Sequence, residues 1–172
     1  LEYSFSELVK NCGIDMTECS LIEENGRAHF LTKRFDRENG RKLHMQTLCG
    51  MAHYDFRLKN GHSYEQAFNV MRRLRLPYSQ AQEMFRRIVF NVVVRNQDDH
   101  TKNISFLMDS SGQWSLSPAY DMGFAYNPLG AWTATHQMSI NGKFDNITRA
   151  DLLSLANANN IKNASEIIDQ VC

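Results

Sequence analysis

The chain has 172 residues, 42% hydrophobic and 22% charged, so it is long enough to bury the core of one domain. Its formal net charge of +0 favours neither nucleic acid nor an anionic membrane surface as a partner. No apolar run reaches the length of a transmembrane helix, and no charged-then-apolar leader opens the chain. The four cysteines form no CxxC pair, so we expect free thiols in a reducing, cytoplasmic setting.

Helix starts are marked along the chain by Ser, Thr or Asn followed three residues later by an acidic or amide residue. In this arrangement the two side chains satisfy backbone N–H groups that the first helical turn leaves unpaired. The pairs are Ser4 with Glu7, Ser63 with Gln66, Ser79 with Gln82, Thr148 with Asp151, and Asn163 with Glu166. Each pair predicts the beginning of a helix.

Two hairpins are predicted between these helices. Residues 19–23 and 27–33 flank Glu24-Asn25-Gly26, where Asn-Gly supplies the positive φ angles that a tight turn requires. Residues 104–108 and 113–116 flank a second turn at 109–112. The order is therefore helix, hairpin, several helices, hairpin, irregular segment and two closing helices. We expect an α+β fold that is mostly helical after residue 40.

The best-patterned helix is predicted from about residue 79 to 95, where Met84, Ile88 and Val92 recur at helical spacing. It leads into eight consecutive polar residues, 96–103, which precede the second hairpin. A polar segment between a buried helix and a strand is typical of a loop that binds a ligand.

Phosphoryl transfer from ATP needs a carboxylate that orients the acceptor hydroxyl and accepts its proton, together with oxygen ligands for magnesium. Protein kinases provide these groups as an Asp, an Asn five positions later, a hairpin, and then Asp-Phe-Gly. Here Asp98 and Asn103 are five positions apart, a hairpin follows, and Asp121-Met122-Gly123 comes next. A lone Asp-x4-Asn motif is weak, because both residues are common in turns. The second acid after a hairpin makes the combination specific, and the pattern predicts a kinase-like site.

The neighbours of Asp98 are less informative. We expect Asp99 to be a solvated neighbour of the site. His100 and Lys102 have two interpretations, as partners of local carbonyl and carboxylate groups or as donors to phosphate oxygens.

The segment from Lys33 to Arg37 also has two interpretations. It could be a hinge between two lobes, in which the main chain of Lys33 and Phe35 binds a nucleotide base and Asp36 accepts from ribose hydroxyls. It could instead be a strand that ends in a charged turn with one buried Phe, which spacing alone favours.

Two other functions are compatible with the same residues. A metal-dependent phosphohydrolase would bind its metal through Asp98, Asp99 and His100, although the other histidines lack paired spacing. A non-catalytic, pseudokinase-type module would bind a partner and transfer no phosphate. Magnesium-dependent binding of an ATP analogue favours the kinase, whereas tight binding of a transition metal favours the hydrolase.

Four segments carry a resemblance to a known family: Lys33-Arg34-Phe35-Asp36-Arg37, Asn96-x-Asp98-x-His100-x-Lys102-Asn103, Pro118-x-Tyr120-Asp121 and Met138-Ser139-Ile140-Asn141-Gly142-Lys143. With these segments the chain resembles, over essentially its whole length, the HipA family of bacterial serine/threonine kinase toxins of toxin–antitoxin modules. The resemblance implies that Asp98 is the catalytic base and that Asn103 and Asp121 hold Mg²⁺. It also implies that ATP is bound by a set of residues comprising Lys33, Arg34, Phe35, Asp36, His100, Thr101, Lys102, Asn103, Tyr120 and Asp121.

The resemblance implies partners as well. Family members phosphorylate a protein hydroxyl, in known cases on an aminoacyl-tRNA synthetase, and are restrained by a helix-turn-helix antitoxin. Their glycine-rich phosphate loop and phosphate-pairing strand lysine lie upstream of the hinge, and nothing before Lys33 matches either. We therefore expect one kinase domain fragment, with 1–36 as a remnant of the small lobe and hinge and 37–172 as the mainly helical catalytic lobe. The missing part would belong to an upstream or separate segment, unless this copy is decayed.

Overall fold

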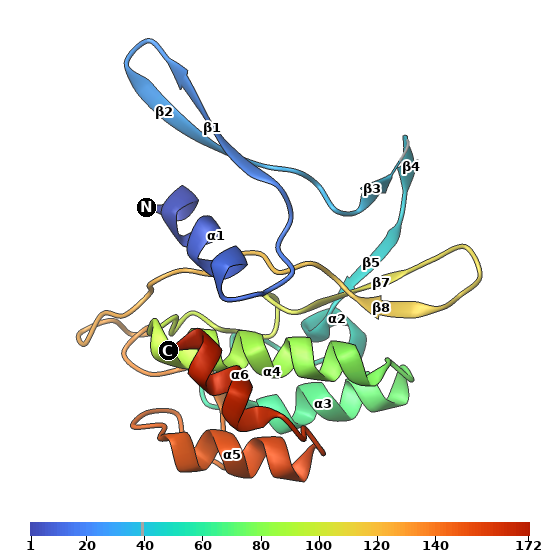
Figure 1. Ribbon diagram of the computed structural model, residues 1–172, viewed down its shortest axis with the longest axis vertical. Coiled ribbons are helices and arrows are strands. Elements are labelled where there is room, and N and C mark those ends of the chain that lie inside the picture. Colours follow the sequence, from blue (N-terminus) through green and yellow to red (C-terminus); the bar gives the residue numbers. More distant parts are fainter. Residues whose placement is uncertain (39) are drawn as a thin grey trace.

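The structure is a computed structural model that describes residues 1–38 and 40–172 (Figure 1). Its helices are α1 (Glu2–Asn11), α2 (Leu48–Ala52), α3 (Tyr64–Arg73), α4 (Tyr78–Val93), α5 (Arg149–Ala158) and α6 (Ala164–Val171). Its strands are β1 (Cys19–Glu24), β2 (Arg27–Thr32), β3 (Arg37–Glu38), β4 (Arg41–Lys42), β5 (His44–Thr47), β6 (His62–Ser63), β7 (Ser105–Met108), β8 (Trp114–Leu116) and β9 (Met138–Ser139). This mixture of helices and short strands confirms the expected combination of α and β elements.

The core surrounds α4, which packs against α3 and α6. Phe85, Ile88, Val89 and Phe90 are all 0% exposed, which confirms the apolar stripe predicted for this helix. Each such side chain contributes about 1.5–3 kcal/mol when it leaves water. The buried helix therefore holds the start of the 96–103 loop in a fixed place. Along the part of the chain that the structure describes, no helix combines the length and apolarity that crossing a bilayer requires.

Two of the predicted helix caps are complete. The Ser63 and Thr148 side chains accept from the backbone N–H groups of Gln66 and Asp151, whose side chains bond back to the N-cap backbone. Asn163 occupies the N-cap of α6 as predicted, but its side chain makes no cap bond. Its amide oxygen instead accepts from the Gln82 side chain at 2.6 Å, and this bond joins α6 to α4.

The caps predicted at Ser4 and Ser79 are wrong. Helix α1 starts at Glu2, with Leu1 at its N-cap. Helix α4 starts at Tyr78, because Pro77, with φ −67° and no N–H group, already occupies the N-cap. Both serines therefore lie inside the first turn.

The first hairpin, β1–β2, confirms the turn prediction. Glu24 pairs with Arg27 across a two-residue turn in which Asn25 and Gly26 have φ of 52° and 73°. The hairpin projects away from the helices, beyond α1 (Figure 1). Three of its apolar side chains, Leu21, Ile22 and Leu31, are 45%, 49% and 40% exposed. Two strands alone bury little, so this hairpin has little support from the rest of the fold.

The second predicted hairpin is β7–β8. Its turn is organised by Asp109, whose Oδ1 atom accepts from the backbone N–H groups of Ser111 and Gln113. Strand β5, which the sequence did not reveal, pairs antiparallel with β7 and completes a three-stranded sheet. The pairs β3–β4 and β6–β9 were also not predicted. The β5–β7–β8 sheet fixes the far end of the 96–103 loop, whose near end is fixed by α4.

Candidate nucleotide and phosphate site

The 96–103 loop is bound to the segment that contains Asp121. The Asn96 side chain is 3% exposed, and its amide nitrogen donates to the Asn91 side chain at 2.9 Å and to the Asp121 carbonyl at 3.4 Å. The loop and the segment after the β7–β8 hairpin therefore lie side by side, although 25 positions separate them. This contact brings the two halves of the predicted motif together.

Asp98 and Asn103 are also joined directly. The Asn103 amide nitrogen donates to the Asp98 carbonyl at 2.9 Å, and the His100 backbone N–H donates to the same oxygen at 2.9 Å. Because the amide nitrogen of Asn103 is engaged with the backbone, its Oδ1 atom is the group left to face a ligand. The five-residue spacing therefore closes a small ring in which the Asn103 carbonyl oxygen has a fixed direction.

One cavity of about 500 Å³ brings together four of the predicted site residues. Its lining includes Asp98, Asn103, Tyr120 and Asp121, with Phe30 and Thr32 of β2 and Phe5 of α1. The lining thus combines carboxylate and amide oxygens with aromatic rings. A volume of this size, with apolar walls and a few polar groups, is typical of a small-molecule site.

Asp121 has an unusual backbone conformation. Its φ is 56°, in the left-handed region that costs a residue with a β-carbon about 1 kcal/mol or more. Strained backbone of this kind gathers at functional sites, where the surroundings hold a side chain in one direction. The side chain of Asp121 is exposed at the cavity, where it is accessible to a cation.

Burial raises the pKa of Asp98, and the negative charges of Asp121 and Asp99 raise it further, while His100 lowers it. Two of the three charged groups that act on the Asp98 carboxylate, Asp121 and Asp99, therefore repel it. A divalent cation bound between Asp121 and the Asn103 oxygen would relieve this repulsion.

Asp99 is not solvated, and our expectation for it is wrong. It is 3% exposed, and its carboxylate accepts from the Tyr64 hydroxyl at 2.6 Å, from His136 Nδ1 at 2.9 Å and from the Gln137 backbone N–H at 2.7 Å. Both oxygens are thus engaged inside the protein. Asp99 anchors the loop to α3 and to the segment before β9, whereas Asp98, one position earlier, faces the cavity.

Residues 33–36 do not line the cavity. The Lys33 N–H donates to the Glu18 carbonyl at 2.9 Å, and the Lys33 carbonyl accepts from the Thr17 hydroxyl at 2.8 Å. The Asp36 carboxylate accepts from the Arg34 guanidinium, and this pairing lowers the pKa of Asp36 to about 2. The geometry matches the simpler interpretation, in which a strand ends in a charged turn.

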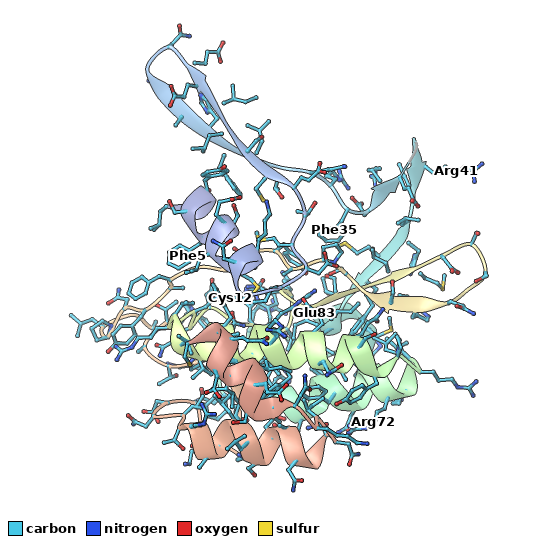
Figure 2. All side chains as sticks on the ribbon, viewed as in Figure 1. Phe5, Cys12, Phe35, Arg41, Arg72 and Glu83 are labelled. Atoms are coloured by element: carbon cyan, nitrogen blue, oxygen red, sulfur yellow. The ribbon has the colours of Figure 1, made fainter. Side chains whose placement is uncertain are left out.

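Phe35 links this turn to the site. Its ring lies 5.5 Å from the Tyr120 ring, centroid to centroid. Figure 2 shows Phe35 between the projecting hairpin and the helices. The Tyr120 hydroxyl donates to the Lys102 carbonyl at 2.6 Å and also bonds Ser105. Tyr120 therefore presents its ring, rather than its hydroxyl, to the cavity.

The remaining predicted residues have separate surroundings. Thr101 is 1% exposed and donates to the Tyr54 carbonyl at 2.8 Å. The Lys102 ammonium lies 3.6 Å from the centre of the Phe56 ring. The Nδ1 atom of His100 is buried and has no hydrogen-bond partner among the described residues. Among these three residues, His100 is the one whose charge acts on the Asp98 carboxylate.

Comparison with known proteins identifies the family. The model of the HipA-like C-terminal domain matches residues 1–172. The chain belongs to this family. The resemblance found in the sequence is thereby confirmed.

Two curated relatives of this HipA-like domain are named as kinases. A Haemophilus influenzae protein named "Putative kinase" is 29% identical over 136 residues, covering 70% of the chain and 39% of that protein. A Sinorhizobium fredii protein named "Putative kinase Y4mE" is 26% identical over 120 residues, covering 64% of the chain and 28% of that protein.

A solved structure shares the fold. HipA of Shewanella oneidensis MR-1, solved with HipB and its operator DNA, superposes with a TM-score of 0.79 at 21% identity, covering 99% of the chain and 45% of HipA. The HipA-like domain therefore spans less than half the length of the relatives that it matches.

The phosphohydrolase alternative finds no support in the geometry. Among residues 1–38 and 40–172, no three His, Cys, Asp or Glu side chains gather in a way that could hold a metal ion. Asp99, one of the three ligands which that alternative requires, directs its carboxylate to Tyr64, His136 and Gln137.

Proposed function

We propose that this HipA-like domain is the catalytic part of a kinase that transfers a phosphoryl group from ATP, with Mg²⁺, to a serine or threonine hydroxyl of a protein. The observation that supports this most directly is the shared cavity of Asp98, Asn103 and Asp121, in which the Asn103 amide is fixed against the Asp98 carbonyl. The names of the two curated relatives support the same class of enzyme.

In this proposal Asp98 orients the acceptor hydroxyl and accepts its proton. Its raised pKa makes it a better proton acceptor than an ordinary Asp. Asn103 Oδ1 and the Asp121 carboxylate would hold Mg²⁺, because both are oxygen ligands of the kind it prefers and both face the cavity. When bound, Mg²⁺ neutralises the charge of the phosphates during transfer. His100 and Lys102 supply nearby cationic or donor groups, and the Tyr120 ring shapes the wall.

The base of ATP would lie toward β2 and the hinge, where Phe30, Thr32 and the Tyr120 ring, which packs against Phe35, provide apolar surface. Because both backbone groups of Lys33 already have partners, the polar contacts to adenine would come from Arg34 and Phe35. Asp36 would reach a ribose hydroxyl only after releasing Arg34.

Activity would also require polypeptide beyond the HipA-like domain, in the same chain or a separate one. We propose that 1–36 is the part of the small lobe and hinge present here and that 37–172 is the catalytic lobe. The exposed apolar side chains of the β1–β2 hairpin support a further small-lobe segment packing there. The solved HipA–HipB complex supports an antitoxin as a second partner, which the family resemblance implies is a helix-turn-helix protein. Free thiols at all four cysteines would suit a cytoplasmic setting.

The test combines binding with transfer. Titration of a non-hydrolysable ATP analogue should show affinity that depends on Mg²⁺ and that Asp121→Ala abolishes. Incubation of the full-length protein with γ-labelled ATP should label a protein hydroxyl, and Asp98→Asn should reduce the rate by at least about 10²-fold. Asp145→Asn, an exposed carboxylate remote from the cavity, is the matched control. Normal transfer by Asp98→Asn would remove the base assignment, and Mg²⁺-independent binding would remove the metal role.

A further inference from the structure

A second cavity, of about 450 Å³, opens beside the first. Its lining comes from the 56–57 segment, the 130–133 loop, His100, Gln137 and Asp98. Asp98 is the one described residue that lines both this cavity and the one assigned to ATP. In phosphoryl transfer the donor phosphate and the acceptor hydroxyl must meet at the group that orients the hydroxyl. The second cavity therefore lies where an acceptor would have to approach.

Two aromatic residues, Phe56 and Trp132, line this second cavity, and ring contacts and hydrogen bonds hold their segments in place. Phe56 packs its ring against His100 at 5.4 Å between centroids and lies beneath the Lys102 ammonium. On the other wall, the Lys59 ammonium donates to the Ala131 carbonyl at 2.7 Å, and the Gln137 side chain donates to the Trp132 carbonyl. The Gln137 backbone N–H in turn donates to Asp99. Both walls are thus tied to the loop that holds Asp98.

Trp132 is 49% exposed, although its backbone is held in place. An exposed aromatic side chain on a backbone that is held in place is typical of a residue that contacts a partner. Trp132 and Asp98 line the same cavity, so a partner bound at Trp132 lies next to that carboxylate.

We propose that this second cavity binds the acceptor segment of a protein substrate, with an apolar side chain close in sequence to the accepting hydroxyl held between Phe56 and Trp132. The proposal rests on the kinase function proposed above. A protein segment fits better than RNA, because two cations near this cavity are already engaged: Arg57 with the Asp55 carboxylate at 3.1 Å and Lys59 with the Ala131 carbonyl.

The first experiment measures binding without requiring catalysis. In the 172-residue chain with Trp114→Phe, Trp132 is the remaining tryptophan, so its fluorescence reports occupancy of this cavity. The probes are short peptides with a central Ser, in which each neighbouring position carries in turn Leu, Phe, Ala, Glu or Lys. We expect saturable quenching, with about tenfold tighter binding when Leu or Phe occupies one particular neighbouring position. Equal binding of all peptides, no response to any peptide, or tighter binding of a single-stranded RNA oligonucleotide would overturn the proposal.

The second experiment separates this proposal from the kinase function itself. In the full-length protein, Trp132→Ala should lower kcat/KM for the preferred peptide by about tenfold, mainly through KM, and should erase the preference for an apolar neighbour. The KM for ATP should not change. Leu129→Ala, in the same loop but outside the cavity lining, is the control and should behave as the wild type. If no peptide is phosphorylated but Trp132 still reports selective binding, the kinase function fails while the peptide site stands. If peptides are phosphorylated and Trp132→Ala has no effect, the peptide site fails alone.

Discussion

Replacing Asp99 by Asn should destabilise the protein strongly, although the same change at Asp98 should not. The Asp99 carboxylate accepts from Tyr64, His136 and Gln137 at 2.6, 2.9 and 2.7 Å and is 3% exposed. An Asn side chain keeps one acceptor oxygen, which can still serve the Gln137 N–H. Its NH₂ group then faces the other two donors.

A hydrogen bond to a charged group contributes about 1.5–3 kcal/mol, and two such bonds are lost. Part of the loss is recovered, because the Tyr64 hydroxyl can turn its proton and a His can change tautomer. We therefore expect the free energy of unfolding to fall by about 2–4 kcal/mol. At about 2–4 °C per kcal/mol for a chain of this size, the Tm should fall by about 5–15 °C.

The assay is urea unfolding followed by far-UV circular dichroism, with the m-value checked for constancy. Asp98→Asn is the matched control, because Asp98 is partly exposed and its carboxylate accepts no side-chain or backbone hydrogen bond among the described residues. Its neutral replacement removes a charge that burial disfavours, so its stability should stay within about 0.5 kcal/mol of the wild type or rise. Equal urea midpoints for the two variants would refute the assignment of Asp99 as an anchor.

Asp98, the starts of two helices and the β1–β2 turn can each be tested by a substitution. The Asp98 carboxyl, followed by NMR, should titrate above its ordinary pKa of 3.8 because of burial, and His100→Ala should raise that pKa further. Since the pKa is higher in the folded state, the free energy of unfolding should fall as the pH rises through that pKa. Phosphoryl transfer should fail as the pH drops below the same pKa. Thr148→Ala should cost about 1 kcal/mol in unfolding free energy, whereas Ser79→Ala should cost nothing measurable, because only Thr148 caps its helix. Gly26→Ala, at φ 73°, should destabilise the β1–β2 hairpin by about 1 kcal/mol, and faster amide exchange confined to β1 and β2 would report it.

Local chemistry explains which parts of the fold could be predicted. The β1–β2 turn follows from Asn25-Gly26, and the caps at Ser63 and Thr148 follow from pairs three residues apart. At Ser79 the same pattern failed because Pro77 had already set the start of the helix. Strand β5 could not be predicted, because its four residues show no alternation and become a strand only by pairing with β7, about 60 positions later in the sequence.

The residues of the site also differ in whether the sequence reveals them. Asp98, Asn103 and Asp121 could be found because a loop and a hairpin of fixed length bring them together, so spacing along the chain stands in for distance in space. No such spacing marks the partners of Asp99, since Tyr64 and His136 lie 35 and 37 positions away. The two adjacent acids are chemically identical in the sequence and differ only in which way the folded loop turns them.

In related sequences with an Asp-Asp pair at this place, the first Asp should be easier to replace than the second. Loss of Asp98 removes a group that faces the cavity and leaves the fold intact, so a chain that lacks it can persist as a binding module. Loss of Asp99 leaves buried donors from Tyr64, His136 and Gln137 without an acceptor. It also removes the bond that holds the Gln137 backbone, whose side chain donates to the Trp132 carbonyl. A chain that changes Asp99 should therefore change Tyr64 or His136 with it, because an uncompensated change costs the stability on which both cavities depend. A stable family member with an apolar residue in place of Asp99 but with Tyr64 and His136 retained would contradict this reasoning.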